Sequence, residues 1–396
     1  MMQISPEIQL FIREHSSDDV RVLALQAKKY PDIDMPTVIT QIAGRKVAAE
    51  KIPSWWEIEK IWYPKHLSLE QCSSEITARY KARLLQGDSL TDLTGGFGID
   101  CSFLATGFKS ATYVERQEEL CEIAAHNFPV LNLNHINIKN EDGVTYLQVM
   151  SPVDCLFLDP ARRNEHGGKT VAISDCEPNV AELEELLLQK ANRVMIKLSP
   201  MLDLSLALKE LKQTQEVHIL SVNNECKELL ILLGQTSPAE ISIHCVNLFT
   251  KGTQKEQHFV FTREQEQCSE CTYTDSLETY LYEPNASLLK AGAFRSIAAA
   301  YPVRKLHPNS HLYTSDTFIE NFPGRIFRIV NQCSFNKKEV KENLADLKKA
   351  NVTVRNFPAT VAELRKRIHL AEGGDTYLFA STLNNGQKVL IRCDKV

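Results

Sequence analysis

The sequence predicts a doubly wound α/β sheet, preceded by an N-terminal helical domain and followed by a small C-terminal α+β domain. From Ser89 onward, short apolar segments alternate with helical stretches, and each apolar segment ends in polar or turn residues. This alternation implies right-handed βαβ units and a parallel sheet with helices on both faces. At 396 residues the chain is also too long for a single ordinary core. The predicted boundaries are 1–85 for the helical domain, 86–272 for the sheet, 273–320 for a small connecting unit and 321–396 for the α+β domain.

Residues 1–85 show helical periodicity. One predicted helical face is formed by Val20, Leu23, Ala24 and Ala27, with spacing i, i+3, i+4 and i+7. Prolines 31, 36, 53 and 64 separate the helical segments. Residues 68–87 predict one helix that starts at Ser68 and ends at Gly87.

Seven segments are strand candidates for the sheet. Five of them alternate with helices and lie at 89–95, 111–116, 136–142, 153–160 and 193–200. Segments 216–222 and 228–234 follow with only a short polar stretch between them, which predicts an antiparallel pair closing one edge of the sheet. Residues 241–249 and 258–265 predict a further strand pair.

Charge is distributed unevenly along the chain. Residues 321–396 carry 14 Lys or Arg and 7 Asp or Glu, a net charge of +7, whereas the other residues carry −12 and the whole chain −5. A basic domain on an acidic body indicates a polyanionic partner, although a solvated charged surface would give the same pattern.

Cysteine usage and hydropathy place the protein in the cytoplasm. Eleven cysteines are scattered, several of them inside apolar runs, which is typical of reduced buried thiols. The N-terminal segment has acidic residues where a secretory signal would need a basic start, and no stretch approaches the ~18–20 apolar residues of a membrane span. We therefore expect a cytoplasmic protein without a membrane partner.

The segment Asp92-Leu-Thr-Gly-Gly-Phe-Gly-Ile-Asp100 lies where the first strand ends and a helix begins. Glycines at 95, 96 and 98 allow a sharp turn and a close approach of backbone to ligand. Glu115 ends the second strand, where a carboxylate suits the two hydroxyls of a ribose.

These features occur in both dinucleotide enzymes and S-adenosylmethionine (SAM) enzymes. The dinucleotide fingerprint requires a third glycine where this chain has Cys101, and Asp92 would repel a pyrophosphate. The sulfonium and ammonium groups of SAM tolerate a nearby acid. SAM is favoured, and a nicotinamide cofactor remains an alternative.

A second motif, Asp159-Pro160-Ala161-Arg162-Arg163, follows the fourth strand. In a doubly wound sheet, ligands collect at the carboxyl ends of strands near the switch point, so this loop is expected to border the glycine bend. A proline-fixed Asp159 could accept a hydrogen bond from a substrate amine, and Arg162 and Arg163 could bind an anion. A structural turn with solvated arginines is the alternative interpretation.

Together, DLTGGFGID, YVER and LDPARR resemble the motifs of class I SAM-dependent methyltransferases. The segments from Gln41 to Pro53, LEQCSSEITARYKA, KLSPMLD and YEPNASLLKAG narrow the resemblance to a bacterial family with a C-terminal THUMP-like domain. The resemblance covers nearly the whole chain and implies a seven-stranded Rossmann-like methyltransferase sheet. THUMP-type modules are associated with RNA modification, so the resemblance also implies an RNA substrate.

Roles are carried over from this family by position. The residues implied to line the methionine end of SAM are Asp92, Thr94, Gly95, Gly96 and Gly98. Glu115 is implied to hold the ribose and Asp142 to face the adenine. Asp159 and Pro160 match the family motif, but Ala161 and Arg162 replace the last two positions of the pattern used for amino-group methylation. The stretch after the fifth strand, Lys197-Leu-Ser-Pro200, offers no nucleophilic cysteine.

We therefore predict a SAM-dependent methyltransferase that modifies a base in structured RNA by direct in-line transfer, with Asp159, Pro160 and Arg162 as its catalytic residues. The alternatives are a methyltransferase acting on DNA, protein or a small molecule, and a non-catalytic RNA-binding protein with a relic pocket. RNA is expected to bind the C-terminal domain through basic residues on its two helices. These residues are Lys337, Lys338, Lys341, Lys348, Lys349, Arg365, Lys366 and Arg367. No metal is expected, because Cys268 and Cys271 form a single pair with no second pair to complete a zinc site.

Overall fold

The computed structural model describes residues 5–162, 172–236 and 238–396. The chain forms two compact units. The N-terminal unit comprises Met1–Gln215 and Leu229–Pro238, and the C-terminal unit comprises Glu216–Glu228 and Ala239–Val396. Within the described ranges, no helix has the length and apolar character needed to cross a bilayer.

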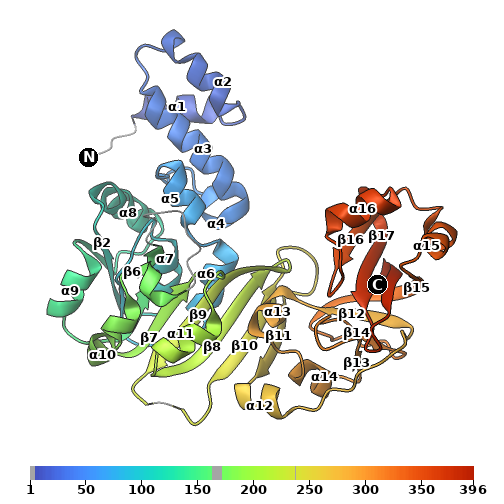
Figure 1. The fold of residues 1–396 in the computed structure, drawn as a ribbon. Helices are drawn as coiled ribbons and strands as arrows, with labels where there is room; N and C mark the ends of the chain where they lie inside the picture. The colour runs from blue at the N-terminus through green and yellow to red at the C-terminus, as the bar shows by residue number, and fades with distance from the viewer. Residues whose placement is uncertain (1–4, 163–171, 237) are drawn as a thin grey trace. The chain divides into compact units, whose positions relative to one another are not determined.

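Helices form the first part of the N-terminal unit (Figure 1). They are α1 (Pro6–Glu14), α2 (Val20–Leu25), η1 (Ala27–Lys29), α3 (Met35–Lys51), α4 (Pro53–Trp56), α5 (His66–Gln71) and α6 (Glu75–Ala82). The single helix predicted over 68–87 is wrong, because the chain leaves the helical conformation at Cys72 and resumes it after Ser74. The break lies beside Ser73, whose hydroxyl donates to Asp100 in a later helix instead of facing the solvent side of a continuous helix.

A large, mostly parallel sheet follows. Its strands are β1 (Ser89–Asp92), β2 (Ser110–Glu115), β3 (Ile136–Asn140), β4 (Val153–Leu158), β7 (Ala191–Leu198), β8 (Thr214–Val222), β9 (Glu225–Gly234), β10 (Ser242–Leu248) and β11 (Glu256–Phe261). The order in the sheet is β11-β10-β8-β9-β7-β4-β1-β2-β3. The predicted α/β class is confirmed, but the sheet has nine strands instead of seven.

The helices between the strands are α7 (Ile99–Ala105), α8 (Glu118–Val130), α9 (Gly143–Val149), η2 (Ile173–Asp175), α10 (Val180–Lys190) and α11 (Leu204–Glu210). Strands β1, β2 and β3 are successive neighbours that lead to one edge of the sheet, and the chain then returns to form β4 on the other side of β1. Because such crossovers are right-handed, α7 and α8 cover one face, and α9 and α10, which contact each other, cover the other. The switch point therefore lies between the carboxyl ends of β1 and β4.

The pair β8–β9 does not close the sheet, which corrects the prediction for these segments. Asn223 and Asn224 both have positive φ, 49° and 69°, as a two-residue type I′ hairpin requires. β9 pairs antiparallel with β7. β10 then pairs in parallel with β8 along its length and β11 pairs with β10, so the edge of β8 is covered and the sheet gains two strands.

The C-terminal unit contains a second sheet, of order β13-β14-β12-β15-β18-β17-β16. Its strands are β12 (Tyr280–Pro284), β13 (Arg304–Lys305), β14 (Tyr313–Ser315), β15 (Gly324–Ser334), β16 (Lys349–Val354), β17 (Ala371–Thr382) and β18 (Lys388–Lys395). The helices of this region are α12 (Arg263–Cys268), α13 (Ala286–Ala291), α14 (Ser296–Ala300), α15 (Lys337–Leu344) and α16 (Val361–Ile368). Along the chain, residues 324–395 follow the order β15-α15-β16-α16-β17-β18.

Candidate active site

The glycine bend follows β1 directly. Gly96 and Gly98 have φ of 55° and 84°, a left-handed conformation that favours glycine, and Gly98 is the residue before the first turn of α7. A Cβ at Gly95 would lie 2.3 Å from the ring of Tyr113, whereas one at Gly96 would meet nothing nearer than the Thr94 carbonyl oxygen at 3.8 Å. The bend is thus packed on one side at Gly95 and open at Gly96.

Backbone N–H groups of the glycine bend donate hydrogen bonds to the end of β2. The Gly95 N–H donates to the Val114 carbonyl at 2.8 Å, and the Gly96 N–H donates to Glu115 Oε2 at 2.8 Å. Glu115 Oε1 accepts from the Gln117 N–H at 2.8 Å. Glu115 is therefore held beside the bend by amides on both of its oxygens.

Asp92 is a buried carboxyl group, 1% exposed, at the carboxyl end of β1. Its Oδ1 accepts from the Thr94 N–H at 3.0 Å. Burial raises the pKa of Asp92 well above its ordinary value, against the opposing effect of the Thr94 amide. The negative charges of Asp100, Asp159 and Glu115 raise it further, so this pocket disfavours added negative charge.

The acidic corner after β4 lies against the glycine bend. The Asp159 N–H donates to Thr94 Oγ1 at 2.6 Å, and the Leu93 N–H donates to the Phe157 carbonyl at 3.0 Å. Pro160 is buried. The two motifs that were predicted from separate strands therefore form one site. Arg162 lies in β5 (Ala161–Arg162), which pairs antiparallel with β6 (Cys176–Glu177), and Arg163 lies outside the described residues.

Two buried lysines, Lys81 and Lys197, form ion pairs with the aspartates of the site. Lys81 Nζ lies 2.9 Å from Asp100 Oδ1 and donates to Ser73 Oγ at 2.8 Å, and the Ser73 hydroxyl donates to Asp100 Oδ2 at 2.7 Å. Lys197 Nζ lies 3.6 Å from Asp100 Oδ2 and is bonded to Asp159 Oδ2. The N-terminal helices, α7, β7 and the β4 corner are thus connected through a chain of alternating charges.

The pKa values of the two aspartates in this chain of charges, Asp100 and Asp159, are shifted in opposite directions. Burial alone would raise the pKa of Asp100, but Lys81 and Lys197 outweigh it and hold that pKa below its ordinary value. Burial also acts on Asp159, and there it outweighs the lowering effect of Lys197, so the pKa of Asp159 is raised. Asp100 is therefore the permanently ionised partner, and Asp159 is the carboxyl group better suited to exchange a proton.

Sequence reasoning did not assign Ser73, Lys81 and Lys197 to this charge network. A signal for Lys197 was present, because a lysine in the apolar strand segment VMIKL must find a partner when buried. Lys81 gave no comparable signal, because a lysine in a polar helix ordinarily faces solvent.

Asp142 takes the position of a helix cap. It is exposed, and its Oδ1 accepts from the N–H groups of Val144 and Thr145 at 3.1 and 3.0 Å at the start of α9. A Cβ at Gly143 would lie 2.1 Å from the Leu93 carbonyl oxygen, so the start of α9 packs directly on the loop after β1. Asp142 is thus next to the glycine bend, with one oxygen occupied by capping.

The arrangement fits a cationic nucleoside better than an anionic dinucleotide. Four acids act on one another around the bend, namely Asp92, Asp100, Glu115 and Asp159. These negative groups oppose a pyrophosphate and favour a positive ligand. The open side of Gly96 allows the backbone to approach that ligand.

Comparison with solved structures gives a match over almost the whole chain. A crystal structure from Porphyromonas gingivalis W83, which carries a provisional methyltransferase name, aligns with a TM-score of 0.87 and 35% identity over 98% of both chains. Residues 324–395 match the family model described as THUMP domain-like, and residues 280–323 match one described as a ferredoxin-like domain. The chain belongs to the class I SAM-dependent methyltransferases with a THUMP-like C-terminal domain.

Two further solved structures align only in part. An rRNA methylase from Streptococcus thermophilus shares 14% identity over 40% of this chain and 93% of its own, with a TM-score of 0.30. TrmK of M. capricolum, solved with S-adenosyl-homocysteine, shares 12% identity over 41% of this chain and 68% of its own, with a TM-score of 0.32. None of the curated proteins matches this chain.

Proposed function

We propose that this methyltransferase-family protein transfers a methyl group from SAM to a base in structured RNA. The main observation behind the proposal is that the glycine bend and the acidic corner are in contact, because the Asp159 N–H donates a hydrogen bond to Thr94 Oγ1. Cofactor-binding and substrate-binding groups must lie side by side for a direct transfer.

Four groups would bind SAM, which supplies an electrophilic methyl group on a sulfonium. Asp92 contributes a buried carboxylate for a positive ligand, and Gly96 leaves room beside the backbone. Glu115 is fixed by the amides of Gly96 and Gln117, so it can accept hydrogen bonds from ribose hydroxyls without a rotamer change. Asp142 would face the adenine from the start of α9.

Asp159 would orient the nucleophile and accept its proton. Its side chain is 36% exposed, so it can reach a substrate, and Lys197 holds one of its oxygens. The rigid Pro160 fixes the corner that carries it. Arg162 is the third residue assigned to catalysis, because an arginine beside Asp159 can bind an anionic group.

The C-terminal module would bind RNA through phosphates. Exposed lysines and an arginine lie on α15, on α16 and at the start of β16; they are Lys337, Lys338, Lys341, Lys348, Lys349, Lys366 and Arg367. Arg365 on the same helix is less exposed and lies 3.7 Å from Glu372. Such a surface binds a polyanion with little sequence preference.

The Asp92→Asn substitution tests cofactor binding. We expect the affinity for SAM, measured by calorimetry, to fall by at least about tenfold, because a charge-assisted contact contributes roughly 1.5–3 kcal/mol. Since the folded-state pKa of Asp92 is raised, its ionisation destabilises the free protein as pH rises through that pKa, so the same substitution should raise the melting temperature without SAM.

The control for this experiment is Asp88→Asn, at an exposed aspartate just before β1 that pairs with Lys109 at 2.8 Å. It should leave the affinity for SAM unchanged. Unchanged affinity in Asp92→Asn would refute the assigned cofactor site.

Salt dependence tests the RNA-binding role of the module. Binding of a hairpin RNA, measured by gel shift, should weaken linearly in a plot of log affinity against log salt concentration. The double variant Lys337→Ala with Lys338→Ala should reduce that slope by roughly 1.4–1.8, since each phosphate contact contributes roughly 0.7–0.9. The matched control is Lys28→Ala with Lys29→Ala, at two exposed lysines of η1. Affinity that does not change with salt would contradict electrostatic docking.

The substrate class is tested separately. Purified protein is incubated with SAM carrying a labelled methyl group and with total RNA, DNA, protein and metabolite fractions. The proposal expects label in RNA, and label in another fraction alone would reject the RNA assignment while preserving the methyltransferase.

A further inference from the structure

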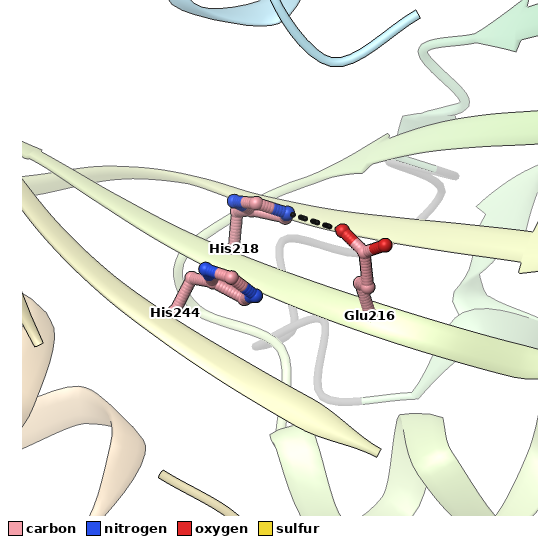
Figure 2. Close-up of side chains that lie close together, drawn as sticks. All are labelled: Glu216, His218 and His244. Carbon is pink, nitrogen blue, oxygen red and sulfur yellow. Dashed lines mark hydrogen bonds and ion pairs between the residues drawn. The ribbon is translucent and has the colours of Figure 1, made fainter. Parts of the chain in front are cut away.

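Three histidines and a glutamate gather on strands that the methyltransferase site does not use. Glu216 and His218 are on β8, His244 is on β10 and His258 is on β11 (Figure 2 shows the first three). His218 is the register partner of His244, and His258 pairs with Val246, two residues further along β10. Because side chains alternate between the faces of a sheet, the four side chains share one face.

The side chains are close enough to share one ligand. The Nε2 atom of His218 lies 3.2 Å from Glu216 Oε2, and the rings of His218 and His244 stack with centroids 4.3 Å apart. One ligand atom from each of Glu216, His218 and His244 can be chosen such that all three lie within 4.8 Å of one another. In Figure 2 a ring nitrogen of His244 lies on the side that faces Glu216.

His244 is held as a neutral imidazole with a defined orientation. Burial, together with His218 and His258, lowers its pKa to about 4, and Glu216 opposes this effect. Its Nδ1 lies 3.1 Å from His258 Nε2. If His244 Nδ1–H donates to His258, the lone pair of His244 lies on Nε2, which is the arrangement that a second ring contact provides in metal-binding histidines.

We propose that Glu216, His218 and His244 bind one divalent transition-metal ion, with Zn²⁺ as the probe. Two imidazoles and one carboxylate suit Zn²⁺ and leave a coordination position open. Metal bonds of about 2.0–2.2 Å require ligand atoms roughly 3–3.5 Å apart, which the 3.2 Å pair already meets. The His244 ring lies at only 15° to the His218 ring, so it must turn as well as approach for its lone pair to point at the same ion.

Binding must move a hydrogen. His218 Nε2 and Glu216 Oε2 lie 3.2 Å apart, and the metal takes the place of the hydrogen between them. The imidazole then carries its hydrogen on Nδ1, which leaves the Nε2 lone pair for the N–M bond while Glu216 forms the O–M bond. With this change of tautomer no proton has to leave the protein, and zinc binding itself is a measurement independent of any methyl transfer.

The competing zinc ligands are thiols. Cys268 is exposed and Cys271 is half-buried, and both are free. The experiment therefore starts from a full-length chain carrying Cys268→Ser and Cys271→Ser, freed of metal by chelator. ZnCl₂ is titrated calorimetrically, and Co²⁺ absorption is recorded in parallel.

We expect one equivalent of Zn²⁺ and a Co²⁺ spectrum without thiolate charge-transfer bands. Glu216→Gln should weaken the affinity for Zn²⁺ at least about tenfold, as should His244→Gln. The control Glu225→Gln, at an exposed carboxylate 2.7 Å from Lys227, should leave it unchanged. Circular dichroism establishes that each variant is folded. Loss of zinc binding in the cysteine variant, or equal affinity in Glu216→Gln and the control, would overturn the proposal.

Discussion

Replacing Asp159 with asparagine is expected to lower kcat for methyl transfer by about 10²–10⁴-fold, the range that a positioned general base contributes. Asparagine keeps the shape of the side chain and the backbone N–H that donates to Thr94. It removes the carboxylate that would accept the proton of the nucleophile. The affinity for SAM should stay near that of the unmodified protein, so the loss should appear in kcat alone.

The pH profile provides a second readout for Asp159. A base must be deprotonated, so the rate should rise as pH rises through the pKa of Asp159. Because burial raises that pKa, the acidic limb should lie above the ordinary aspartate range, and it should vanish in Asp159→Asn. A normal rate and an unchanged acidic limb in Asp159→Asn would exclude this residue as the base.

In the proposed mechanism, Lys197 would act on the reaction through Asp159, as a positioning residue. Its ammonium lowers the pKa of Asp159 against the effect of burial, so Lys197→Met should move the acidic limb to higher pH. Lys197→Arg keeps the charge and should restore most of the original profile. If Lys197 had only a structural role, its replacement would change the rate of methyl transfer without shifting the acidic limb of the pH profile.

The sequence was sufficient for features encoded locally. Glycines at the end of a strand, an acid at the end of the next strand and an Asp-Pro corner identify the loops of a doubly wound sheet, and the topology brings such loops together. The contact between the Asp159 N–H and Thr94 Oγ1 is one consequence of that rule.

Features that depend on distant partners could not be predicted in this way. The break at Cys72–Ser74 depends on Asp100, which lies in a helix after β1. The sequence predicts β10 and β11 only as a separate strand pair, because no pattern within 241–249 indicates that this segment pairs with the edge of β8. The histidines on β8, β10 and β11 meet only through the strand register.

Replacing Lys81 with methionine is expected to destabilise the N-terminal unit by about 3–5 kcal/mol, the effect of breaking a buried ion pair from one side. The Lys81 side chain is 0% exposed and its partner Asp100 is 10% exposed. Methionine fills similar space but leaves Asp100 with Ser73 and the more distant Lys197. All three tryptophans of the chain, at 55, 56 and 62, lie in this unit, so the midpoint of urea unfolding followed by their fluorescence measures it selectively.

The matched control is Lys109→Met, which breaks a pair with Asp88 whose side chains are 79% and 69% exposed, and should shift the midpoint little. The double variant Lys81→Met with Asp100→Asn should lose less free energy of unfolding than the two single variants lose in sum. The second change removes the charge that the first left unpaired. Equal shifts in Lys81→Met and Lys109→Met would show that the buried pair contributes nothing.

The pH dependence of the same unfolding experiment tests the cause. The pKa of Asp100 is lowered in the folded protein, so its contribution is present above the ordinary aspartate pKa of 3.8 and is lost as pH falls through the folded value. Lys81→Met should reduce this acid-dependent loss. Since Asp100 also contacts Lys197, and Lys197 contacts Asp159, the Lys81→Met variant should transmit its effect to the reaction as well. Its acidic rate limb should move in the same direction as that of Lys197→Met and by a smaller amount, because Lys81 is the weaker of the two lysines acting on Asp159.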